Sequence, residues 1–305
     1  MTHILQEDAR RRFVIALTIE NTSMRLWLAT RSEVLVSLPI NWMTVRDLFL
    51  PWLLLTNVAT YQNYRLTTEI LLRLMYADET ALGWDPTMKR LSPRDYVGDV
   101  QYTIECAGVT YRTVRLISDI ATETIRGRGT RVWEVREVKE NSEEDPTPRA
   151  LKDSWVDADR LCEGKILKAI RDDAKKLSNA FDFDRYFMTA KAYDDVYIDG
   201  VKDTTYLARG RSTFTGKVDK PPLVIKAKTP RNRTMRSQAG TKGATQVPDK
   251  DVPKHVKYAA KIHHRIVFTE VGKTIAEVNT LAEALFAMTH IVKGECTARR
   301  RSIHI

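Results

Sequence analysis

Glycine, lysine and glutamate residues follow one another in an order that could hold the phosphate groups of a nucleotide. Gly127 and Gly129 lie in the segment RGRGTRVWEV, Lys152 follows in ALKDSW, and Glu163 follows in a charged segment. Phosphate binding requires backbone N–H groups close to anionic oxygens, which glycines permit because they have no Cβ, and a cation. A strand lysine can supply that cation, and a glutamate on the next helix can hold it in place. The order of these residues therefore predicts a site for nucleotide phosphates.

Each of these residues also has a simpler interpretation. A Gly-x-Gly before a strand is more often a turn, and a strand lysine is more often a solvated residue. Glu163 lies among many charged residues and could simply be exposed. The segment also departs from the pattern G-x-G-x-x-G-x-V, because Val132 and Glu134 occupy its last Gly and Val positions. Only the combination of residues favours a nucleotide site.

The elements before this site are predicted from periodicity. Residues 13–38 contain three apolar β-prone runs with polar breaks, which predict an antiparallel meander. Residues 64–76 place apolar side chains at helical spacing. Residues 101–120 predict two strands with a bend at Ala107 and Gly108. The first 118 residues thus predict a β-rich region with one helix.

The elements after Lys152 are predicted in the same way. Residues 157–177 predict a helix that Asp157 or Asp159 caps, with apolar residues mainly on one face. A strand follows in HHRIVFTEVG, and TLAEALFAMTHIVKG predicts a helix that ends at Gly294. Between them, residues 200–256 lose periodicity and predict a long loop or disordered insertion.

Charge and composition restrict the class of protein. The net charge is +10, and the segment from Arg209 to Arg265 alone contains 15 Lys and Arg against three Asp. The three cysteines are far apart and predict neither a disulfide framework nor a metal site. The most apolar stretch is too short for a membrane span, which needs roughly 20 residues, and the N-terminus lacks a secretory pattern. We expect an intracellular protein, cytoplasmic or nuclear, that does not bind membranes.

Several long segments resemble the fungal-type protein kinase family. They are YRTVRLISDIATETIRGRGTRVWEV, LKDSW with the DADR and EG that follow it, HRIVFTEVGKTI, DARRRFVIALTIENTSMRLWLATRS and LGWDPTM. The resemblance implies an α+β fold: a protein kinase-like small lobe with a β-rich N-terminal extension and most of the large lobe missing. The expected divisions are 1–118 for the extension, 119–294 for a partial kinase-like domain with its basic insertion at about 200–256, and 295–305 for an unpatterned tail.

The resemblance also implies a site for ATP. Lys152 would contact the α and β phosphates and Glu163 would pair with it, although their separation is shorter than in ordinary kinases. Gly127 and Gly129 would form the strap, with Val132 after it. Glu270 and Val271 would lie in the hinge and offer backbone groups to adenine.

The residues for phosphate transfer are missing from the sequence. Transfer requires a catalytic-loop Asp and Asn and Asp ligands for Mg²⁺, in H-R-D and D-F-G segments. Neither segment is present, and no Asp or Asn follows Asn279. We therefore predict no catalytic and no metal-binding residue, and Mg²⁺ binding only if the missing large lobe is supplied.

Three hypotheses on function follow. The favoured one is a truncated kinase-like protein, or pseudokinase, that binds ATP but is inactive alone, with a protein partner covering the apolar C-terminal helix. The second is a basic interaction module, in which the basic insertion binds an acidic partner or, less favoured, nucleic acid. The third is a fragment of an active Ser/Thr-type kinase whose gene model is incomplete.

Overall fold

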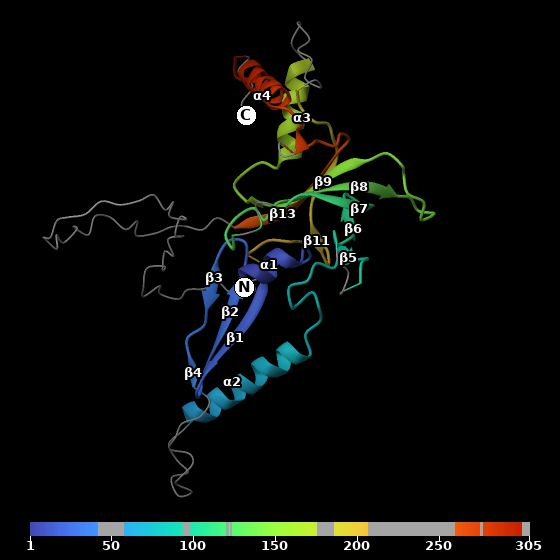
Figure 1. The fold of residues 1–305 in the computed structure, drawn as a ribbon. Coiled ribbons are helices and arrows are strands. Elements are labelled where there is room, and N and C mark those ends of the chain that lie inside the picture. Colours follow the sequence, from blue (N-terminus) through green and yellow to red (C-terminus); the bar gives the residue numbers. More distant parts are fainter. Residues whose placement is uncertain are drawn as a thin grey trace, which may run out of the picture. The chain divides into compact units, whose positions relative to one another are not determined.

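The computed structural model describes most of the chain outside its basic segment. Residues 1–210 and 259–305 belong to one compact unit, and residues 211–258 lie outside the described residues (Figure 1). The predicted insertion and the nucleic-acid hypothesis therefore fall mostly on residues that are not described. The described residues are 1–41, 58–93, 98–119, 122, 124–175, 186–206, 260–274 and 277–300.

The N-terminal residues form a short helix and a small antiparallel sheet. Strand β2 is its centre, because it pairs with each of the other three strands. The β1–β2 hairpin turns at Asn21, whose φ of 52° is one that asparagine adopts more readily than most residues. The meander predicted over residues 13–38 is confirmed. The elements are α1 (Thr2–Glu7), β1 (Val14–Glu20), β2 (Ser23–Ala29), β3 (Val34–Val36) and β4 (Ile40–Asn41).

The described residues also form a seven-stranded antiparallel sheet, in which the strand order is β10-β13-β9-β8-β7-β6-β5. The hairpin between β6 and β7 bends at Ala107 and Gly108, both with positive φ, as predicted. Strand β7 pairs with β8, so the sheet continues across residue 118, where we expected a boundary. The strands are β5 (Met88–Arg90), β6 (Tyr102–Cys106), β7 (Val109–Ser118), β8 (Arg131–Val138), β9 (Arg149–Asp157), β10 (Ala190–Asp195) and β13 (Lys261–Phe268).

The sheet has an apolar core on each face. One core contains Tyr111, Trp133, Leu151 and Val267, which are almost completely buried. The other lies under helix α3 (Glu163–Lys175) and is formed by Ala150, Leu167, Ile170, Ile266 and Phe268. Burial of each large side chain contributes about 1.5–3 kcal/mol. Because successive strand residues point to opposite faces, neighbours on β9 take part in different cores.

Helix α3 begins later than predicted. Asp157 ends strand β9 instead of capping a helix, because its carboxylate accepts a hydrogen bond from Lys261 on the neighbouring strand. The helix begins at Glu163 and lies very close to the sheet. At Gly164 a Cβ would lie 2.2 Å from the ring of Tyr193, so glycine permits this approach.

Two other elements also differ from prediction. Helix α4 (Leu281–Arg300) continues through Gly294, which is tolerated because one glycine costs a helix interior only about 1 kcal/mol. The expected loop beginning at residue 200 instead contains strand β12 (Val201–Lys202), which forms an ordered hairpin with β11 (Tyr197–Ile198). Asp203 and Thr205 after it are buried.

Helix α2 (Val58–Met75) confirms the helix predicted over 64–76.

Helix α4 exposes a series of large apolar side chains, such as Leu281, Phe286 and Ile291, each at least 66% exposed. A partner that covers them stays a prediction.

Candidate functional site

Lys152 and Glu163 form an ion pair in the structure. Lys152 Nζ donates a hydrogen bond to Glu163 Oε2 at 2.5 Å, and the two side chains are 23% and 43% exposed. Glu163 is the first residue of α3, where a carboxylate also interacts favourably with the helix dipole. The short sequence separation is sufficient because α3 begins soon after β9 and packs tightly on the sheet at Gly164.

The surface beside Lys152 is apolar. Lys152 lies directly across from Val132 on β8 and from Ile266 on β13, and paired residues project from the same face of a sheet. Ala150 and Phe268 form the next row on that face. Val132 is partly buried and packs against the apolar cluster that contains Ala150, Ile266 and Phe268. The arrangement places one partly exposed cation beside Val132, at the edge of the apolar core that α3 covers.

Gly127 and Gly129 lie in the loop that leads into β8, and both contact the N-terminal region. The Gly127 N–H donates to the Arg31 carbonyl oxygen at 3.1 Å. Gly129 has a φ of +51°, and a Cβ on it would lie 2.7 Å from Arg31 Nε. Among the described residues no hydrogen bond joins either glycine to Lys152 or Glu163. The structure therefore explains these glycines by close packing and leaves their phosphate role a prediction.

Glu270 and Val271 directly follow strand β13. The Glu270 carboxylate accepts a hydrogen bond from the Thr189 N–H at 2.8 Å, which fastens this segment to the residue before β10. Burial alone would raise the pKa of Glu270, but the hydrogen bonds from Thr189 lower it. The carboxylate thus has a structural role. Contact with a base, as predicted, would involve the backbone of Glu270 and Val271.

The opposite face of the sheet contains a buried charge network that the sequence did not predict. Arg265 donates to Asp153 Oδ1 at 2.8 Å and to Asp85 Oδ2 at 2.5 Å. His263 contacts Asp153 through Nε2 at 2.8 Å and Asp203 through Nδ1 at 3.0 Å. Both ring nitrogens face carboxylates, so each must carry a proton. Arg12 completes the network by donating to Asp203 at 3.0 Å.

The network shifts the pKa values of His263 and Asp153. Burial alone would lower the pKa of His263, but the charge of Asp153 and the hydrogen bonds to Asp153 and Asp203 raise it to about 9. Burial would likewise raise the pKa of Asp153, but His263 and Arg265 hold it well below its usual range. His263 is therefore a cation beside the Asp153 carboxylate and the Arg265 guanidinium. The network joins the N-terminal region to β9 and β13.

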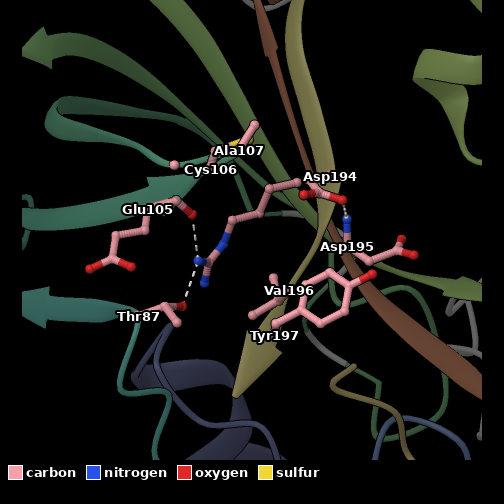
Figure 2. Close-up of a pocket in the computed structure, with 10 residues that line it drawn as sticks. Thr87, Glu105, Cys106, Ala107, Asp194, Asp195, Val196 and Tyr197 are labelled. Carbon is pink, nitrogen blue, oxygen red and sulfur yellow. Dashed lines mark hydrogen bonds between the residues drawn. The ribbon is translucent and has the colours of Figure 1, made fainter. Parts of the chain in front are cut away.

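A cavity of about 160 Å³ lies beside this network (Figure 2). Several of its polar groups already bond within the fold: Arg265 donates to Thr87 Oγ1 at 2.7 Å and to the Glu105 carbonyl oxygen at 2.8 Å. The Asp195 N–H donates to Asp194 Oδ1 at 2.8 Å. These contacts serve the fold and do not mark a ligand.

Comparison with known protein families identifies the family of the chain. The model of the fungal protein kinase family matches residues 1–298. Since the match covers nearly all of the sequence, the chain belongs to the fungal protein kinase family. No curated protein matches the chain. No solved structure matches it either. In the part of the chain that is described, no helix is both long and apolar enough to cross a membrane.

Proposed function

We propose that the chain binds a nucleoside triphosphate, ATP by family, on the face of the sheet that bears Lys152. The observation that supports this most directly is the partly exposed Lys152–Glu163 pair at the edge of the apolar core under α3. An ammonium group held by a carboxylate and still partly exposed can exchange part of that contact for phosphate oxygens.

The neighbouring residues suit the other parts of a nucleotide. Val132, which is only partly buried, offers an apolar contact for the base, and the backbone of Glu270 and Val271 directly follows strand β13. Gly127 and Gly129 would lie near the phosphates. Mg²⁺ needs oxygen ligands, and the described residues contain no group of three or more His, Cys, Asp or Glu that could hold a metal ion. We assign no metal-dependent step to them.

We propose further that these residues do not transfer phosphate by themselves. Phosphoryl transfer requires an acidic residue that orients the acceptor hydroxyl, together with metal ligands. The sequence has neither an H-R-D nor a D-F-G segment. Incubation with labelled ATP should therefore give binding without a labelled protein substrate.

The test is ATP binding by calorimetry, with Lys152→Ala compared with wild type. Lys191→Ala is a matched control, because Lys191 is also a strand lysine paired with a glutamate, Glu137, and is 31% exposed. We expect saturable binding by the wild type and by Lys191→Ala, and at least about tenfold weaker binding by Lys152→Ala. Equal affinity of all three proteins, or no binding by a folded wild type, would contradict the proposal.

A further inference from the structure

Arg31 is a buried arginine of the N-terminal region whose hydrogen bonds lead to the loop before β8. Its side chain is 1% exposed. Nη1 donates to the carbonyl oxygens of Thr124 at 3.2 Å and Thr122 at 3.4 Å. Nη2 donates to the carbonyl oxygen of Leu5 in α1 at 2.8 Å. One guanidinium thus connects α1 to the loop.

Residues of the same loop also contact Arg31 and strand β9 directly. We define residues 124–130 as the strap. Gly127 donates its N–H to the Arg31 carbonyl oxygen, and Gly129 leaves the space that the Arg31 guanidinium fills. At the end of the strap, the Arg128 carbonyl oxygen accepts a hydrogen bond from the Trp155 N–H at 2.7 Å. The strap is therefore fixed between the N-terminal region and β9, the strand that bears Lys152.

The bonding pattern of Arg31 differs from that of an ordinary buried arginine. Among the described residues no carboxylate lies within ion-pair distance of Arg31 or of its neighbour Arg131. Arg131 also donates to the Leu5 carbonyl oxygen, at 3.1 Å. A buried guanidinium is commonly paired with a carboxylate. Arg31 is bonded to backbone carbonyls instead, which suits a residue that sets the path of a loop.

We infer that Arg31 is a positioning residue: it fixes the strap, and through the strap it sets the affinity for the phosphate groups of the nucleotide. The second part rests on the proposed function. It makes the N-terminal region an integral part of the nucleotide site. A strap held in one conformation loses little conformational freedom when a ligand binds, so release of the strap weakens binding.

The experiment combines limited trypsin digestion with ATP binding. Arg126 and Arg128 lie exposed in the strap, and cleavage after them reports its release directly. Arg31→Lys removes the guanidinium, and Arg25→Lys is its control at an exposed position on the preceding strand, β2. Gly129→Ala disturbs the contact from the strap side. Gly108→Ala is its control, because Gly108 also has a positive φ, of +77°, but a Cβ there would meet nothing within 4 Å.

We expect faster cleavage after Arg126 and Arg128 in Arg31→Lys and Gly129→Ala, with no general increase elsewhere in the chain. ATP affinity should fall about tenfold in both and stay unchanged in the two controls. Thermal unfolding identifies a variant that fails to fold, and the other variant then decides the question.

Each other outcome has a definite meaning. Unchanged strap cleavage in a folded variant would overturn the positioning role of Arg31. Faster cleavage with unchanged ATP affinity would overturn the link from strap to phosphate. A wild type that binds no ATP, combined with faster cleavage in the variants, would overturn the proposed function while the positioning of the strap by Arg31 stands.

Discussion

Lys152 and Asp153 are neighbours on strand β9 and carry opposite charges, yet they belong to two different environments. Lys152 is partly exposed and has one carboxylate partner, Glu163. Asp153 is 3% exposed and is bonded to both His263 and Arg265. The alternation of a strand sends them to opposite faces of the sheet.

The difference shows how charge can serve either structure or binding. The face of Asp153 brings three carboxylates and three basic side chains together in a buried cluster, and each of them bonds to a partner inside the fold. The face of Lys152 leaves an ammonium group partly exposed beside apolar side chains. Only the second arrangement has capacity for an anionic ligand, and this is why we place the nucleotide there.

The largest effect is expected from breaking the buried network. Asp153→Asn leaves His263 and Arg265 without their shared counter-charge, and removing one member of a buried ion pair typically costs about 3–5 kcal/mol. We expect the free energy of unfolding in urea to fall by that amount. Asp157→Asn on the same strand is the control, because Asp157 is 25% exposed and should cost about 1 kcal/mol or less. Similar losses in both variants would show that the network is not special.

A smaller effect is expected from pH. The pKa of His263 is raised to about 9 from the ordinary 6.5, so its stabilising contribution is complete below pH 6.5 and decreases as the pH rises through 9. The loss over that interval is roughly 3 kcal/mol, since each pKa unit corresponds to about 1.4 kcal/mol.

Urea unfolding of the wild type between pH 6 and 9.5 measures this loss. His3→Gln is a control that should keep the same pH dependence, because His3 is 78% exposed. Stability that stays constant between pH 6.5 and 9 would contradict the double protonation of His263 in the folded protein.

The two faces also differ in what the sequence could predict. The elements around Lys152 could be predicted because Gly, Lys and Glu follow one another in a known order. The apolar residues of the strands also alternate. The pairing of Lys152 with Glu163 is present, although the helix was predicted to begin six residues too early. Asp157 favours a helix cap by its type alone, and only the position of Lys261 shows that it belongs to the sheet.

No sequence pattern predicted the buried charge network on the opposite face of the sheet. Its members come from residues 12, 85, 153, 203, 263 and 265, and no local pattern connects positions so far apart. Asp203 was assigned to a long loop, because the sequence loses its periodicity over residues 200–256. The role of Gly129 was missed for the same reason: a glycine before a strand predicts a turn, whereas the closeness of Arg31 depends on tertiary structure.

The smallest effect on stability is expected at Lys152 itself, next to the residue with the largest. Lys152→Met keeps the aliphatic part of the side chain and removes a partly exposed ion pair, and such pairs contribute about 0–1 kcal/mol. We expect the urea midpoint of Lys152→Met to lie close to that of the wild type, while Asp153→Asn is strongly destabilised. If Lys152→Met lost as much stability as Asp153→Asn, the lysine would be a structural charge like its neighbour, and the reason for placing a ligand on its face would be gone.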